Sequence, residues 1–188
     1  MIGTNTAAGM SAKPMPVIAI GMLLLGACTF NVHKVQVDTA RLETGKPVGT
    51  LQCAYGPAEV LDARPAGDRA GGLGEHMLLL DDPTALIAER LRKAGMGDGT
   101  AQDAVSVRIA IKRFYLTQNT MAKVPVVVLQ ARIDQQEPFL VRAQPVTANW
   151  NGTENEAYSA MANALQGALT QLVTELNGKC GARTDNSP

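Results

Sequence analysis

A long stripe of apolar residues near the C-terminus constrains the fold of this chain more than any other feature. The stripe runs through residues 153–177 at spacings of three and four, which place its members on one face of a helix. Its members are Ala157, Met161, Ala164, Leu165, Ala168, Leu169, Leu172, Val173 and Leu176. Thr153 and Glu156 have the spacing of a capping box, and Asn177-Gly178 is a stop signal. The pattern predicts a helix of about six turns that needs a broad apolar partner.

Three segments upstream alternate between apolar and polar residues with a period of two, as strands with one solvated face do. They are residues 104–116, 124–135 and 139–150, and Pro145 marks the third as an edge or bulged strand. Residues 51–62 are interrupted by Gly-Pro and are expected to form one bent strand, or two strands with a bulge. An antiparallel sheet is therefore the predicted partner of the long helix.

A second, shorter helix is expected between the first strand and the other three. Asp82 and Pro83 are a helix start signal, and Gly95 follows Ala94 as a stop. The preceding residues 66–75 are rich in glycine and are expected to form a loop. The order β-α-β-β-β-α predicts an α+β fold, a two-layer sandwich with an antiparallel sheet and two packed helices.

The balance of charge argues against one broad class of partner. The chain has 188 residues, of which 17 are Lys or Arg and 17 are Asp or Glu. It therefore carries no net charge that would attract nucleic acid or an anionic membrane surface. One Trp, three Tyr and three Phe are too few for the stacking platform of a single-strand binder. We expect no nucleic-acid partner.

An apolar run near the N-terminus is the candidate membrane segment of the sequence. It spans residues 17–27, about eleven residues, whereas a spanning helix needs about 20. A short apolar run after Lys13 is typical of a secretory signal peptide, and Met10 or Met15 is an alternative start. The competing interpretation is a buried helix of the domain, although the run has no amphipathic pattern.

The run ends in Leu25-Gly26-Ala27-Cys28, which resembles the lipobox of bacterial lipoproteins. The resemblance implies cleavage between Ala27 and Cys28, a diacylglycerol on the Cys28 sulfur and an acyl chain on its amino group, with no other cofactor. Thr29 stands where an Asp commonly signals retention in the inner membrane in this family. The resemblance therefore implies lipid anchoring at the periplasmic face of the outer membrane, with inner-membrane retention as the alternative.

These signals divide the chain into four parts. Residues 1–27 are the expected signal peptide, and residues 28–49 the lipidated N-terminus with a polar tether. Residues 50–180 are expected to form a single α+β domain, followed by a flexible tail at 181–188.

The cysteines support this division. With Cys28 assigned to lipid, Cys53 and Cys180 remain, and export to an oxidising compartment predicts a disulfide between them. The bridge would close a loop of about 128 residues, for which chain entropy gives roughly 4–5 kcal/mol as an upper figure. Two separate buried thiols are the alternative. His33 and His76 lack a metal-ligand spacing with these cysteines, so no metal site is expected.

Arg64, Asp68 and Arg69 stand beside the glycine-rich stretch and are a candidate anion- or peptide-binding loop. The alternative is an ion pair between Asp62 and Arg64 at a strand end, with glycines that supply turns. No Gly-Lys-Ser or Gly-Lys-Thr follows, so the stretch does not fit a phosphate loop.

The sequence contains no clear catalytic constellation. No Gly-x-Ser-x-Gly is present, and His76 is the best candidate for a general base, although a surface or loop histidine is the simpler interpretation. Asp81 and Asp82 are explained by the helix start that follows them. We therefore expect a protein that is not an enzyme.

The domain has a recognisable series of features. Val60-Leu61-Asp62-Ala63-Arg64-Pro65 ends the first strand, a glycine pair follows, a helix closes at Gly95, and three strands precede the long Ala/Leu-rich helix. In these features residues 50–177 resemble the YajG-like lipoproteins and the auxiliary lipoproteins of envelope ABC transport systems. The resemblance implies a fold like the N-terminal domain of TolB and no catalytic residues. The two further cysteines depart from the pattern of that family.

Together these features predict a non-enzymatic lipoprotein that acts as an accessory or binding module in cell-envelope maintenance or transport. Its expected partners are the membrane, through the lipid anchor, and an envelope protein. The alternative is a structural or assembly component of a secretion apparatus or surface appendage. An envelope hydrolase that uses His76 is a third hypothesis.

Overall fold

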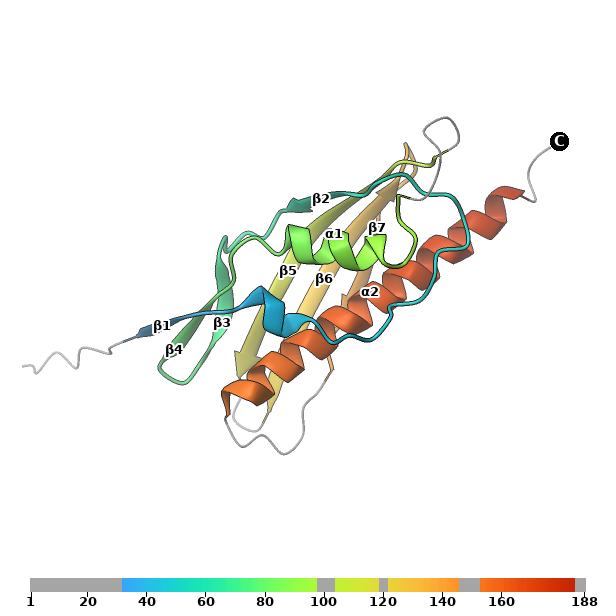
Figure 1. The fold of residues 1–188 in the computed structure, drawn as a ribbon. Coiled ribbons are helices and arrows are strands. Elements are labelled where there is room, and N and C mark those ends of the chain that lie inside the picture. Colours follow the sequence, from blue (N-terminus) through green and yellow to red (C-terminus); the bar gives the residue numbers. More distant parts are fainter. Residues whose placement is uncertain (1–31, 98–103, 119–121, 146–152, 185–188) are drawn as a thin grey trace, which may run out of the picture. The chain divides into compact units, whose positions relative to one another are not determined.

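An antiparallel meander and one long helix form the centre of the fold (Figure 1). The structure is a computed structural model that describes residues 32–97, 104–118, 122–145 and 153–184, with the side chains of the last helix as far as Lys179. Its strands are β1 His33–Gln36, β2 Glu59–Asp62, β3 Arg69–Leu73, β4 His76–Leu79, β5 Val107–Gln118, β6 Lys123–Ile133 and β7 Phe139–Ala143. Its helices are the short 3-10 helix η1 Thr39–Leu42, α1 Thr84–Arg92 and α2 Glu154–Thr184.

The long helix covers one face of the meander. α2 packs against β5, β6 and β7, whereas α1 packs against β2 (Figure 1). The apolar stripe of α2 is buried along its length, and Leu165, Leu169, Leu172 and Leu176 have no exposed surface. The predicted two-layer α+β class and the three-stranded meander are confirmed.

A bulge in β5 changes which of its residues face the helix layer. Val107, Ile109 and Ile111 are buried first, and after a register shift between Ile111 and Arg113 the buried residues are Phe114 and Leu116. An extra residue in one strand shifts every later side chain to the opposite face. Gln118, at the end of β5, therefore lies on the same side as Phe114 and Leu116.

The sheet continues beyond β5 with parallel pairs that were not predicted. β2 and β3 both pair with β5 in parallel, near its two ends, while β4 is antiparallel to β3 and β1 is parallel to β4. The expected antiparallel sheet is thus corrected to a mixed one, because a period of two is common to both pairings. Residues 51–55 contribute only an isolated bridge between Tyr55 and Val105.

The expected tether at 28–49 is wrong for residues 33–49, which belong to the domain. β1 pairs with β4, and Val37, Leu42 and Val48 are buried in the core. The compact unit accordingly extends from residue 31 rather than from residue 50. β1 and η1, the two elements in this segment, are only four residues long each. Elements this short do not repeat a pattern often enough to be recognised among the polar residues around them.

The glycine-rich segment 66–75 is also corrected, because it contains β3 and the turn to β4 rather than only a loop. Gly71 pairs with Leu116 of β5, and a Cβ at this glycine would lie 1.8 Å from the carbonyl oxygen of Leu116. Glycine is therefore present in this strand because two backbones approach closely.

The ends of the two helices differ from the predictions in opposite ways. α1 starts at Thr84 and Pro83 is its N-cap, one residue later than predicted, while Asp82 Oδ1 accepts a hydrogen bond of 2.8 Å from the N–H of Thr84. α2 continues through Asn177-Gly178 to Thr184, so residues 181–184 of the expected tail are helical. No helix among the described residues is long and apolar enough to span a membrane.

Candidate functional site

The candidate site is an apolar cavity of about 420 Å³ between the β1–β4–β3 strands and the first turns of α2. Its volume lies in the range of about 300–1,000 Å³ that small-molecule sites occupy. Val35 and Val37 line it from the N-terminal segment, Leu73 and Leu78 from β3 and β4, and Ala157 and Met161 from α2. Val35, Val37 and Leu73, half of these side chains, come from segments that sequence reasoning interpreted as tether or loop.

Polar groups gather where β5 and β6 meet this cavity. Gln118 and Lys123 are register partners on the two strands, and both line the cavity. Gln118 Oε1 accepts a hydrogen bond of 3.2 Å from the N–H of Gly74, in the turn between β3 and β4. Lys123 is only 9% exposed. The cavity therefore combines an apolar wall with a small polar group of side chains.

The opposite wall is held in place by contacts between η1 and α2. The N–H of Asp38 donates to the hydroxyl of Tyr158 at 2.9 Å, and the Arg41 guanidinium lies 3.7 Å from the centroid of the Tyr158 ring. Arg41 also forms an ion pair with Glu154 and donates to Asn155 Oδ1 at 2.7 Å. These contacts fix the start of α2, and with it the cavity wall formed by Glu154 and Tyr158.

His33 and His76 are brought together on the strands beside this cavity. They are register partners on β1 and β4, and their ring centroids are 5.7 Å apart. His76 lines the cavity. Within the described parts of the chain, no group of three or more His, Cys, Asp or Glu side chains is arranged to hold a metal ion.

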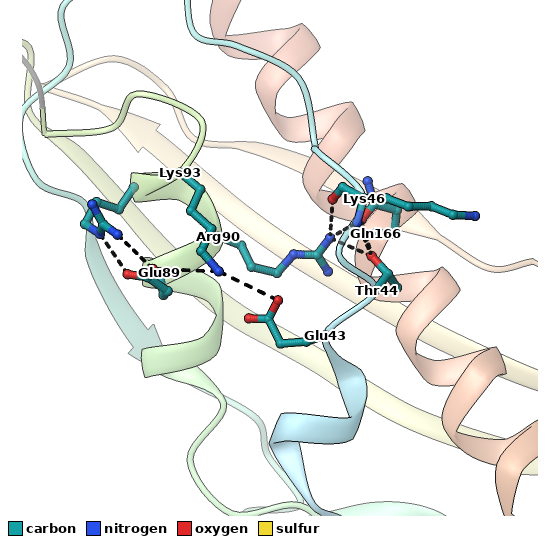
Figure 2. Close-up of polar contacts among 8 residues, drawn as sticks. Glu43, Thr44, Lys46, Glu89, Arg90, Lys93 and Gln166 are labelled. Carbon is teal, nitrogen blue, oxygen red and sulfur yellow. Dashed lines mark hydrogen bonds and ion pairs between the residues drawn. The ribbon is translucent and has the colours of Figure 1, made fainter.

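A second polar cluster surrounds Arg90 between α1 and α2 (Figure 2). Its guanidinium donates to Thr44 Oγ1 at 3.2 Å, to the carbonyl of Lys46 at 3.3 Å and to Gln166 Oε1. Burial lowers the pKa of Arg90, and the Glu43 carboxylate partly offsets that effect. The same arginine thus fastens the segment after η1 to both helices. Within the described residues, the contacts of Arg90 hold the segment after η1 in position.

The predicted loop of Arg64, Asp68 and Arg69 is not assembled as one site. Arg64 is buried, donates to both carboxylate oxygens of Asp62 at 2.7–3.1 Å, and reaches the carbonyl of Leu80 at 2.9 Å. Asp68 and Arg69 are exposed. The hydrogen bonds from Arg64 lower the pKa of Asp62. The alternative interpretation, an ion pair at the end of a strand, describes this region.

The structure does not describe all of the remaining predicted site residues. Ala27 and Cys28 belong to the segment 1–31, which the structure does not describe. Cys53 is half-buried against the core. The side chain of Cys180 is not described, so the pairing of Cys53 with Cys180 stays a prediction.

Comparisons with known proteins find solved structures of low sequence identity to this chain. No protein-family model and no curated protein matches the sequence. Protein XCC0632 from Xanthomonas campestris, a DUF330 protein of solved structure, is 14% identical, with a TM-score of 0.46 over 74% of this chain and 95% of that protein. A solved structure described as an uncharacterized protein is 12% identical, with a TM-score of 0.38 over 70% of this chain and 95% of that one.

Proposed function

We propose that the protein is a non-enzymatic, lipid-anchored lipoprotein of the outer membrane that binds an apolar molecule as an accessory module of envelope maintenance or transport. The observation that carries the binding role is the cavity of about 420 Å³ between β1 and the start of α2. An apolar occupant of this cavity is favoured, because water against its apolar wall has few hydrogen-bond partners. The resemblance of Leu25-Gly26-Ala27-Cys28 to a lipobox supports the anchored location.

A neutral apolar dye tests the binding role. N-phenylnaphthylamine fluoresces when it leaves water, and we expect saturable binding to the purified domain. Ala157 lines the cavity and is 5% exposed, so Ala157→Phe should fill the space and weaken dye binding by at least about tenfold. Ala66→Phe, on an exposed turn outside the cavity lining, is the matched control. Equal binding by wild type and Ala157→Phe would remove the cavity from the proposal.

The lipid anchor has a separate test. Mass spectrometry of the mature protein from bacterial membranes should give an N-terminal peptide that begins at Cys28 and carries a diacylglycerol and an acyl chain. A peptide that retains Ala27, or an unmodified Cys28, would contradict the anchor without affecting the cavity.

An assembly role is the second candidate, and the edge strand β7 favours it. β7 pairs with β6 and ends the strand order, and Leu140 on it is 62% exposed. Strands at an open edge can pair with a partner strand, and a charge on such an edge opposes that pairing. Affinity capture from solubilised envelope should then recover one stable complex that Leu140→Lys abolishes. Recovery of the same complex with Leu140→Lys would reject this role for β7.

A further inference from the structure

We propose that the sheet face opposite α2 binds an amphipathic helix of a partner protein, one with acidic residues on both sides of an apolar stripe. The inference goes beyond the binding role of the cavity, because the cavity lies on the helix side of the sheet. It follows from the order of charged and apolar side chains across β2, β5, β6 and β7.

The described helices all lie on one side of these four strands. α2 packs on β5, β6 and β7 (Figure 1). Arg41 of η1 and Arg90 of α1 both contact side chains of α2, and the contact of Arg90 with Gln166 is drawn in Figure 2. Strand side chains that alternate with the buried ones point to the other side. We call this side of β2, β5, β6 and β7 the open face.

An apolar row runs across the open face. Leu61 of β2, Ala110 of β5, Gln130 of β6 and Leu140 of β7 are successive register partners. Leu61 is 43% exposed and Leu140 is 62% exposed, whereas large apolar side chains elsewhere on these strands are mostly buried. Two exposed leucines in one row, with alanine between them, form a stripe that an apolar partner can cover.

Arginines flank this apolar row on both sides. Arg108 and Arg132 are register partners in the row on one side of it. Arg113 and Arg142 both pair with Val128, in the row on the other side. All four arginines are exposed. A guanidinium pairs with a carboxylate through two parallel hydrogen bonds, so these rows suit acidic side chains.

The open face carries an excess of positive charge, although the whole chain has 17 Lys or Arg and 17 Asp or Glu. Lys112, the extra residue of the β5 bulge, adds a fifth cation to the four arginines. The acidic strand residue of this face is Glu59, which pairs with Arg108 at 2.6 Å. Asp134 follows β6 directly and accepts from the N–H of Ser106 at 3.0 Å. The described charges of this face therefore complement an acidic partner.

The spacing of the rows matches a helix. Arg132 and Val128 are four positions apart on β6, about 13 Å, and a helix with its side chains is about 10–12 Å wide. The apolar row crosses three strand spacings, roughly 14 Å, which about ten helical residues span. A helix along this row buries its stripe on the two leucines and places acidic residues against both arginine rows. A layer of anionic lipid headgroups presents charge without such a stripe.

Defined peptides test the proposal with the purified protein. The probe is a fluorescein-labelled helical peptide of about 18 residues, in which glutamates flank a leucine stripe. Fluorescence anisotropy should show saturable binding that weakens as salt rises, because exposed charges are screened. A peptide of the same composition without the stripe should bind at least about tenfold more weakly. A peptide with lysine for every glutamate should not bind.

Charge reversal on the two inner strands locates the surface. Arg113→Glu/Arg132→Glu changes one arginine in each row and should weaken binding of the glutamate peptide at least about tenfold. Lys34→Glu/Lys46→Glu makes the same change of charge at exposed positions outside the four strands, and this matched control should bind as wild type does. Circular dichroism and thermal unfolding confirm that each variant is folded.

The outcomes separate this inference from the binding role of the cavity. Equal binding of the two glutamate peptides by wild type, or unchanged binding by folded Arg113→Glu/Arg132→Glu, would overturn it. Sedimentation of wild type with phosphatidylglycerol vesicles, lost in the same variant and without peptide binding, would assign the face to anionic lipid instead. Binding of N-phenylnaphthylamine to the cavity is independent of all these results.

Discussion

At the residue scale, two backbone segments approach each other closely at Gly71. Its φ of +99° is in the left-handed region, and a Cβ there would lie 1.8 Å from the carbonyl oxygen of Leu116. We expect Gly71→Ala to lower the free energy of unfolding by at least about 2 kcal/mol, because the ladder between β3 and β5 must open. Gly67→Ala is the control, since Gly67 has a φ of +59° and open space around it, and should cost about 1 kcal/mol. Denaturant unfolding measures both, and equal losses would contradict the role of the contact.

A second residue-scale prediction concerns Asp62 and pH. Hydrogen bonds from Arg64 lower the pKa of Asp62 in the folded protein below its ordinary value of 3.8. A lowered folded pKa means that the ion pair adds stability above that ordinary value and loses it as pH falls through the folded pKa. Asp62→Asn should therefore be less stable than wild type at neutral pH, and the difference should shrink below pH 3.8. Urea unfolding across this range checks it, and a difference that is constant with pH would contradict it.

The residues that sequence reasoning identified have partners close by in the chain, whereas the residues that it missed have partners far along the chain. Asp62 and Arg64 interact two positions apart on one strand end, so their pairing could be anticipated from the sequence alone. Lys123 lines a cavity together with residues of β4, and Tyr158 accepts a hydrogen bond from the start of η1. Both elements lie far from these two residues along the chain. The inward face of Lys123 follows from the alternation of β6, but the predicted strand began one residue later, at residue 124.

At the element scale, α2 continues through Asn177-Gly178, the pair that was predicted to end it. Gly178 does not adopt a positive φ, and a Cβ added to it would meet nothing within 4 Å, so it is an ordinary helical residue. Gly178→Ala should raise the free energy of unfolding by about 0.5–1 kcal/mol, because alanine loses less backbone entropy in a helix. Chemical denaturation measures the change. A destabilisation would indicate that the helix ends near Asn177 after all.

The contact between η1 and α2 gives a second prediction at this scale. Tyr158→Phe removes the hydroxyl that accepts from Asp38 N–H, while the ring under Arg41 remains. We expect a loss of about 1 kcal/mol in the free energy of unfolding. Tyr158→Leu should cost more, because the ring and its contact with Arg41 are also lost. If the two variants unfold alike, the ring contributes nothing to holding η1.

The predictability of each element depended on its length and on the range of its pairing. β5, β6 and α2 have 12, 11 and 31 residues, enough to repeat a period several times, and their existence and type were predicted. β1 and β4 have four residues each and pair in parallel across more than 40 positions of chain, as His33 with His76. Such strands are stabilised by tertiary packing rather than by local pattern. The cavity was missed for the same reason, since β1 and β4 form its wall.

At the scale of the whole molecule, we propose that a disulfide between Cys53 and Cys180 joins the segment before β2 to the last turns of α2. Asn177 already spans these segments, because its side chain accepts from Gln52 N–H and donates to the carbonyl of Thr50, both at 2.9 Å. The hydroxyl of Tyr55 donates to the carbonyl of Leu176 at 2.8 Å. Cys180 follows on the same helix, one turn after Leu176.

This pairing has a direct test. Non-reducing peptide mapping should link Cys53 to Cys180, and reduction should lower the melting temperature, with roughly 4–5 kcal/mol as the upper limit of the lost stability. The Cys53→Ala/Cys180→Ala double variant should melt like the reduced wild type and be insensitive to reductant. Labelling of both thiols in the native oxidised protein would contradict the pairing.

The parallel pairing of β1 with β4 also has a mechanical meaning. β1 is the first element of the domain, so any force transmitted through the preceding chain enters at His33. Its ladder is flanked by bonds from His33 N–H to Glu75 O at 2.9 Å and from Val37 N–H to Leu79 O at 2.7 Å. A pull along the axis of β1 loads these bonds together in shear, whereas a pull across it opens them one after another. A domain built in this way resists tension along β1 and yields to peeling across it, which force spectroscopy along the two directions can measure.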